Sequence, residues 1–222
     1  MRSGNTTLAM PISDLVLAEI NPAISRKLVK VLAGIKVLPG MVLAKIIAGA
    51  AAAVAKVGNT GNGVLTLDAA SPILHHVVPG IYTLVCIAAL ANAGTFRVYA
   101  PNGTVLGDVT VGGAAFANQV HFTIADGVID FVVGDTFEIT VAEGSGKYQQ
   151  LDPAGVGGAE VAAAIGYEEV DATLAEAQGV VLVRGAVVDE AGLIWPAGIT
   201  PAQQAAALNV LEARGIATRV AL

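Results

Sequence analysis

Short apolar runs, separated by turns rich in glycine and asparagine, recur through the middle of the chain. Between residues 58 and 144 they predict strands at Val64–Leu67, Ile81–Ile87, Thr95–Ala100, Val105–Val111, Val120–Ile124 and Thr136–Val141. Several of these runs alternate apolar and polar residues, which is typical of strands that bury one face. Pro101-Asn102-Gly103 lies between two of them and predicts a hairpin turn. Residues 58–144, which open with the loop Gly58–Gly63, are therefore expected to form a small β-sandwich or barrel.

A second set of strand-like runs flanks this segment. These runs are Lys27–Leu32, Met41–Ile46, Tyr148–Leu151, Ala159–Ile165 and Val180–Val183. The change of pattern at Gly58 and its return near Gly144 indicate a domain inserted into a loop of another. We assign 26–57 and 145–222 to the outer domain and 58–144 to the insert. The alanine-rich stretch Ile47–Val57 favours a helix or a linker.

One helix is predicted near the end of the sequence. Thr200 can cap it, Pro201 fits its first position, and Gln203 completes a capping-box pattern. Residues 202–213 are nearly all good helix formers, and Gly215 predicts the position just beyond the end. The fold class expected from these patterns is mainly β with one C-terminal helix.

Residues 1–25 resemble an arm, because breakers at Met10-Pro11 and Asn21-Pro22 leave no segment that can form a core alone. The apolar residues of this arm are Leu8, Met10, Ile12, Leu15, Val16, Leu17 and Ile20. Such an extended segment can add a strand to the sheet edge of a partner. The alternative is a disordered tail.

The composition indicates a protein that buries much of its surface. Hydrophobic residues make up 55% of the 222 residues and charged residues only 14%, against about 25% charged in typical soluble domains. A membrane protein would explain this, but the apolar stretches are shorter than the roughly 18 residues that a spanning helix needs. The start lacks a secretory signal pattern, which favours synthesis in the cytoplasm. The net charge of −6, without a basic block, disfavours nucleic-acid binding.

No set of residues predicts catalysis, a metal or a cofactor. His75 and His76 are adjacent and would point to opposite faces of a strand, so they are poorly placed to share an ion with His121. Aspartates 126, 130 and 135 lack the spacing of a calcium loop and are expected to bond the backbone of turns. The single cysteine, Cys86, lies in an apolar run and is expected to be buried and inert. We therefore do not expect an enzyme.

The flanking segments together resemble the lambda-type family of bacteriophage head decoration proteins, in a long form with an inserted β domain. The resemblance rests on the order of several motifs. They are Ser25-Arg26-Lys27-Leu28-Val29, Leu38–Lys45, Gly146–Pro153, Gly157–Ile165, Val180–Gly185 and Leu193–Ile199 with the helix that follows. It covers roughly residues 15–47 and 145–222.

This resemblance implies a β-tulip-like core and homotrimers on the outer surface of an icosahedral virion head. It also implies that the apolar residues of the arm bind the major capsid protein and that binding stabilises the shell. Trp195 and Pro196 are candidates for a trimer contact. The alternative function is a carbohydrate- or host-surface-binding module carried by the insert.

Overall fold

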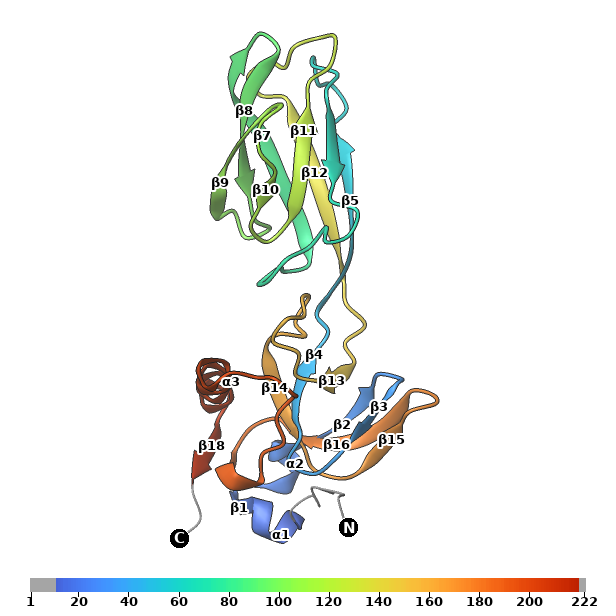
Figure 1. Ribbon diagram of the computed structural model, residues 1–222, viewed down its shortest axis with the longest axis vertical. Coiled ribbons are helices and arrows are strands. Elements are labelled where there is room, and N and C mark those ends of the chain that lie inside the picture. The colour runs from blue at the N-terminus through green and yellow to red at the C-terminus, as the bar shows by residue number, and fades with distance from the viewer. Residues whose placement is uncertain (1–10, 220–222) are drawn as a thin grey trace, which may run out of the picture. The chain divides into compact units, whose positions relative to one another are not determined.

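The computed structural model describes residues 11–219, which form a mainly β protein as the sequence predicts (Figure 1). The chain divides into two compact units. Unit 1 comprises Met1–Ile46, Gly146–Gly155 and Ala159–Leu222, and unit 2 comprises Ile47–Ser145 with Val156–Gly158. Unit 2 is thus inserted into the sequence of unit 1 between Ile46 and Gly146.

A closed barrel is the centre of unit 1, with its strands in the order β13-β2-β16-β14-β4. The strands are β2 (Arg26–Val31), β4 (Val42–Lys45), β13 (Tyr148–Gln150), β14 (Ala162–Gly166) and β16 (Ala177–Leu182). Every residue of β14 is buried, and four of its five residues are alanine or glycine. Small side chains on this strand allow the barrel wall and the elements outside it to approach closely. A short ribbon of β3 (Ile35–Val37) and β15 (Val170–Ala172) accompanies the barrel.

Three further strands of unit 1 form a separate sheet in the order β1-β17-β18. They are β1 (Val16–Glu19), β17 (Ala186–Asp189) and β18 (Ile216–Arg219). The one-turn helices α1 (Ile12–Leu15) and α2 (Pro22–Ser25) flank β1, and a 3₁₀ turn, η1 (Glu190–Gly192), follows β17. Strand β1 pairs antiparallel with β17, and β18 pairs parallel with it on the other side. This sheet therefore joins the start and the end of the described chain.

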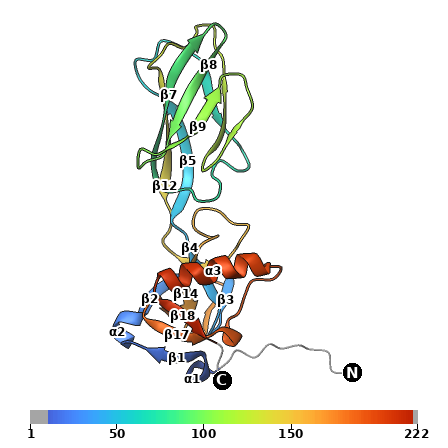
Figure 2. The same ribbon diagram turned by 90° about the vertical axis from the view of Figure 1, so that its left-hand side faces the viewer.

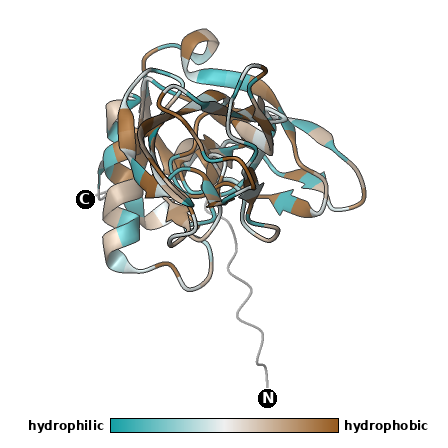
Figure 3. Ribbon diagram, turned by 90° about the horizontal axis from the view of Figure 1, so that it is seen from above, coloured by the Kyte–Doolittle hydropathy of each residue, from teal (hydrophilic) through white to brown (hydrophobic). Residues whose placement is uncertain are grey.

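The predicted helix is confirmed as α3 (Pro201–Ala213), the only helix longer than one turn among residues 11–219. The Thr200 hydroxyl accepts the backbone N–H of Gln203 at 3.3 Å, and the Gln203 side-chain oxygen accepts the backbone N–H of Thr200 at 2.9 Å. Gly215 follows the helix with φ 82°, a backbone conformation that glycine adopts readily. Helix α3 runs beside the strands of unit 1 (Figure 2) and buries Ala207 and Leu211. Figure 3 shows hydrophilic and weakly hydrophobic colours mixed along its ribbon, because many of its residues are alanine and glutamine.

Unit 2 contains two sheets that share one core, which makes it a β-sandwich. One sheet has the order β5-β12-β7-β8-β9 and the other the order β10-β11-β6. The strands of the first are β5 (Ala48–Ala55), β7 (Gly80–Leu90), β8 (Ala93–Tyr99), β9 (Val105–Thr110) and β12 (Thr136–Glu143). Those of the second are β6 (Val64–Leu67), β10 (Phe116–Ala117) and β11 (His121–Ala125).

Large aromatic side chains fill the core between these sheets. Phe96 packs against Phe131 and Phe137, with ring centroids 5.0 and 5.4 Å away. Phe116 stacks on Phe122 across the smaller sheet at 5.2 Å. Burial of each such side chain contributes about 2–3 kcal/mol to stability. The period-two pattern of the sequence corresponds to this core, because on β8 the residues Phe96 and Val98 are fully buried between less buried neighbours.

The prediction of a helix or linker at Ile47–Val57 is wrong, because residues 48–55 form the edge strand β5. Strand β5 pairs antiparallel with β12, from Ala55 opposite Phe137 to Ala48 opposite Glu143. Burial alternates along most of β5. The sequence pattern does not show this alternation, because alanines on both faces of the strand have the same hydropathy. In the structure, unit 2 begins at Ile47.

Candidate interaction surface

From Ile12 onward, the predicted arm is part of unit 1. Leu8 and Met10 lie outside the described residues. Leu15 is fully buried in the core of unit 1, and Ile12 and Val16 are partly buried against the same core. These three side chains pack against the core of unit 1 and anchor the segment; their contact with a partner stays a prediction. Leu17 and Ile20 remain exposed, by 42% and 80%.

Polar contacts fix the end of β1 to the rest of unit 1. The Ile20 N–H donates to the carbonyl of Gly185 at 2.9 Å. The Arg26 guanidinium donates to both carboxylate oxygens of Glu19, with Nε–Oε1 at 3.0 Å and Nη2–Oε2 at 2.6 Å. Arg26 also lies 4.1 Å from the centre of the Tyr167 ring. The hydrogen bond with Glu19 raises the pKa of Arg26 further above its ordinary value.

A second contact to the same loop comes from α2. The side chain of Ser25 is fully buried and its Oγ donates to the Gly185 carbonyl at 3.0 Å. Gly185 has φ 61°, and a Cβ there would lie 3.2 Å from Ser25 Oγ. A glycine is therefore favoured at this position by both its conformation and its neighbours.

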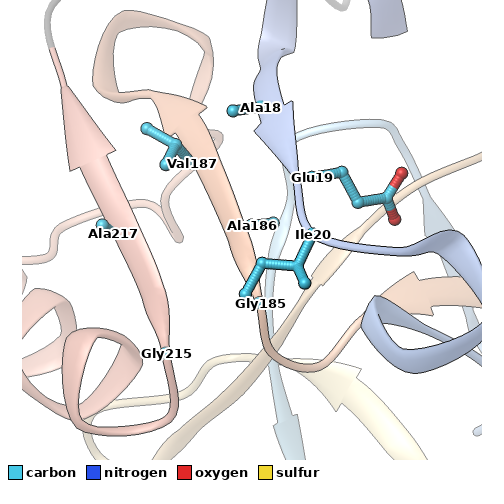
Figure 4. A pocket seen from close by; sticks show the side chains of 8 residues that line it. All are labelled: Ala18, Glu19, Ile20, Gly185, Ala186, Val187, Gly215 and Ala217. Atoms are coloured by element: carbon cyan, nitrogen blue, oxygen red, sulfur yellow. The ribbon is translucent and has the colours of Figure 1, made fainter.

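The sheet β1-β17-β18 carries an apolar groove of about 260 Å³. Its lining consists of Ala18, Glu19, Ile20, Gly185, Ala186, Val187, Gly215 and Ala217. In the strand register Ala18 lies opposite Val187, which in turn lies opposite Ala217. Figure 4 shows these three side chains on neighbouring strands, with Ile20 beside Gly185. The groove is hollow because two alanines leave space on either side of one valine.

The groove is next to an open strand edge. Strand β1 is the last in its sheet, and no described strand pairs with its outer side. An unpaired edge with apolar side chains beside it is a template for strand addition by another chain. Ile24 and Leu28 in the elements that follow are also exposed, by 53% and 62%. The surface can therefore bind an extended apolar segment, through backbone hydrogen bonds and through the groove.

The sequence named Leu17 and Ile20 among the apolar residues of the arm but did not indicate the groove. Its small residues come from two further segments, at 185–187 and 215–217. A glycine precedes an alanine-containing strand in both, which is a weak signal. Only the pairing of β17 with β1 and β18 brings these segments together, and the sequence alone does not reveal such pairing.

The candidates for a trimer contact lie near this sheet in sequence but not in the groove. Trp195 is partly buried and packs against the core of unit 1, and Pro196 is likewise intermediate in exposure. The structure thus gives Trp195 a packing role within the chain. Its role in a trimer stays a prediction.

The histidines and the cysteine lie on separate elements of unit 2. His75 and His76 lie in a turn, and His121 lies on β11. The part of the chain that the structure describes holds no group of three or more His, Cys, Asp or Glu side chains that could bind a metal ion. Cys86 is fully buried, and burial raises the pKa of its thiol. Among residues 11–219, no helix is long and apolar enough to cross a membrane.

Comparisons with known proteins identify the family. Among solved structures, the chain is similar to two crystal structures of Xanthomonas campestris FlgL, at 22% and 23% identity and TM-scores of 0.32 and 0.31. Each match covers 50% of this chain, which spans about a third of FlgL, at 34% and 33%. A comparison with curated proteins gives no match. The family model described as "Bacteriophage lambda head decoration protein D" matches residues 7–216, so nearly the whole described chain agrees with it. The chain therefore belongs to the family of the bacteriophage lambda head decoration protein D.

Proposed function

We propose that the protein binds the outer surface of an icosahedral phage head as a homotrimer and stabilises the shell through contacts with the major capsid protein. The family match over residues 7–216 carries this proposal, because the family consists of phage head decoration proteins. The low content of charged residues supports it, since 14% is little for a protein whose surface stays in water.

The surface around β1 is the part of unit 1 best suited to bind the capsid protein. We assign the contact to the open edge of β1, to the groove beside it and to the exposed Leu17 and Ile20. Leu8 and Met10 precede this strand and are proposed to extend the contact. Leu15 and Val16 instead hold β1 in place from the inside.

Attachment through three copies explains how modest contacts can stabilise a shell. Each strand-edge contact contributes little alone, but three linked contacts raise the effective concentration at the second and third sites. We propose that Trp195 and Pro196 lie near the contact between copies. This trimer arrangement would make detachment slow, because all contacts must open together.

The carbohydrate- or host-surface-binding alternative lacks a supporting feature in unit 2. A sugar site usually offers aromatic faces to its ligand. The aromatic side chains of unit 2 that are buried are Tyr82, Phe96, Phe116, Phe122, Phe131 and Phe137. Tyr99 is the exception, and it is intermediate in exposure. We therefore keep shell binding as the proposed function.

Binding to purified undecorated heads tests the proposal. Full-length protein is expected to sediment with the heads and to raise their resistance to heat. Removal of residues 1–10 leaves all described elements in the chain and is expected to weaken binding, as is Ile20→Asp. Val105→Asp introduces the same charge at a half-exposed position in unit 2 and serves as the control. No sedimentation of the full-length protein, or equal heat resistance of decorated and bare heads, would contradict the proposal.

A further inference from the structure

Two asparagine-glycine pairs lie in loops of unit 2, at Asn62-Gly63 and at Asn102-Gly103. In such a pair the peptide nitrogen of the glycine can attack the side-chain carbonyl carbon of the asparagine, because glycine has no side chain that shields its nitrogen and its backbone rotates easily. The attack needs a rotation of the backbone between the two residues, so the surrounding loop sets its rate. The structure gives the two pairs different surroundings.

The Asn102-Gly103 pair lies in the turn between β8 and β9, where residues 101–104 are all exposed. Nothing lies within 4 Å of the position that a Cβ atom on Gly103 would occupy, so the backbone there can rotate without a collision. The Asn102 Oδ1 accepts the N–H of Thr104 at 3.0 Å, which folds the side chain back along the residues that follow it. One exposed hydrogen bond opposes the attack, since the Gly103 N–H donates to the Ala100 carbonyl at 2.8 Å. Exposed turns of this kind open locally at a low cost in free energy.

The Asn62-Gly63 pair is held on several sides. Asn62 is exposed like Asn102, but its Oδ1 accepts the N–H of Ile129 at 2.9 Å and its own N–H donates to the Ile129 carbonyl at 3.2 Å. Gly63 is buried, and a Cβ atom there would collide with the ring of Phe131 and with a backbone carbonyl. Phe131 is 1% exposed and belongs to the core of unit 2. Rotation of the backbone at this pair would therefore require the displacement of a core side chain.

We propose that Asn102 is a site of spontaneous deamidation and that the fold suppresses the same reaction at Asn62. The Gly103 nitrogen loses its proton to solvent and forms a bond with Asn102 Cγ, and the Cγ–Nδ2 bond breaks with release of ammonia. Water then opens the resulting cyclic imide at either carbonyl, which gives aspartate or isoaspartate at this position. The reaction consumes only water and needs no enzyme, so the inference is independent of the proposed function.

The two products change the turn in different ways. Aspartate keeps an oxygen that can accept the N–H of Thr104, and its charge strengthens this hydrogen bond. Isoaspartate adds a methylene to the backbone between positions 102 and 103, which moves the Gly103 N–H away from its acceptor on Ala100. Both products add one negative charge. Modified protein is therefore separable from the native form by anion exchange.

Ageing of the purified full-length protein tests this site. Folded protein and protein in denaturant are incubated in the same mildly alkaline buffer, which favours loss of the proton from the peptide nitrogen. Peptide mass spectrometry then follows the replacement of the amide NH₂ by OH at each asparagine. In the folded protein Asn102 is expected to react several-fold faster than Asn62. In denaturant the two rates should be similar, because the loops that distinguish the pairs have unfolded.

Asn102→Ser is the matched control, because serine also suits an exposed turn and carries no amide. The acidic form of this variant should accumulate several-fold more slowly than that of the native chain, while Asn62 reacts as before. Equal rates at Asn62 and Asn102 in the folded protein would overturn the inference, as would an Asn102 that reacts only in denaturant. Acidic protein that accumulates equally fast in Asn102→Ser would place the modification elsewhere and would also overturn it.

Discussion

Asp135 is the residue that most directly organises the loop end of unit 2. Its side chain is buried, and its carboxylate accepts the backbone N–H groups of Thr60 and Gly61 at 2.8 Å each. It also accepts the N–H of Val132 at 3.0 Å. Burial opposes ionisation, but the three hydrogen bonds outweigh it and hold the pKa of Asp135 below its ordinary value. The Asp135 carboxylate thereby links the loop that contains Thr60 and Gly61 to the loop that contains Val132.

Asp135→Asn is expected to destabilise unit 2 by about 1–3 kcal/mol, because the new NH₂ group cannot accept these N–H donors. The pH dependence follows from the lowered folded pKa. The carboxylate stabilises the fold above the unfolded pKa of about 3.9, and this stability is lost as the pH falls through the folded pKa. Denaturant unfolding across the acidic range is expected to show a smaller loss of stability in the variant than in the native chain.

Asp130→Asn is the control for this change, because Asp130 is exposed and accepts one backbone N–H. Its unfolding free energy should stay close to that of the native protein. An Asp135→Asn protein that unfolds at the same denaturant concentration as the native one would show that the carboxylate does not hold the loops.

At the scale of single elements, β1 is the strand whose attachment matters most for the proposed contact. It has one partner strand, and its last residue, Glu19, forms an ion pair with Arg26. The Glu19 side chain is only 10% exposed. A strand held at one edge and by one ion pair is expected to open locally before the barrel does.

Glu19→Gln should therefore loosen β1 without unfolding unit 1, at a cost of about 1–3 kcal/mol. Hydrogen exchange measured by mass spectrometry is expected to show faster exchange in residues 16–20. Glu169→Gln, which removes a solvent-exposed ion pair with Lys36, should leave the exchange of β1 unchanged. Unaltered exchange in Glu19→Gln would mean that backbone pairing with β17 suffices to hold the strand.

The elements differ in how far the sequence predicts them, for physical reasons. Helix α3 was predicted closely, because its capping box is a local interaction between Thr200 and Gln203. The hairpin at Pro101-Asn102-Gly103 was predicted for the same reason, and the structure has a turn between β8 and β9 there. Strand β5 was missed, because its conformation is set by pairing with β12 and not by its alanines. The groove was missed because three distant segments form it.

At the scale of the whole molecule, the two ends that the insert leaves in unit 1 are adjacent backbone segments. The Ile46 N–H donates to the Lys147 carbonyl at 3.0 Å, and the Gly146 N–H donates to the Ile46 carbonyl at 2.9 Å. Strands β4 and β13 pair antiparallel just before and after this point. Within unit 1, the ends left by the insert therefore lie at the distance of a hairpin turn.

Replacement of residues 47–145 by Asn-Gly is expected to yield a folded unit 1, because this dipeptide and Gly146, whose φ is 69°, form a three-residue loop that ends in a left-handed glycine between antiparallel strands. The shortened chain should show a single cooperative thermal transition and should still sediment with undecorated heads. The same replacement combined with removal of residues 1–10 is the control and should bind more weakly. A shortened chain that is unfolded by circular dichroism would show that unit 1 depends on unit 2.

The interruption of unit 1 by unit 2 has a consequence during synthesis. When the ribosome has added Ser145, the barrel still lacks β13, β14 and β16, whereas both sheets of the sandwich are complete. The 77 residues that follow take roughly 4–15 s to translate at ordinary elongation rates. During this interval the sandwich can fold, while β2 and β4 still lack their partner strands in the barrel. We therefore expect unit 2 to fold first during translation, and unit 1 to fold after its later strands have been synthesised.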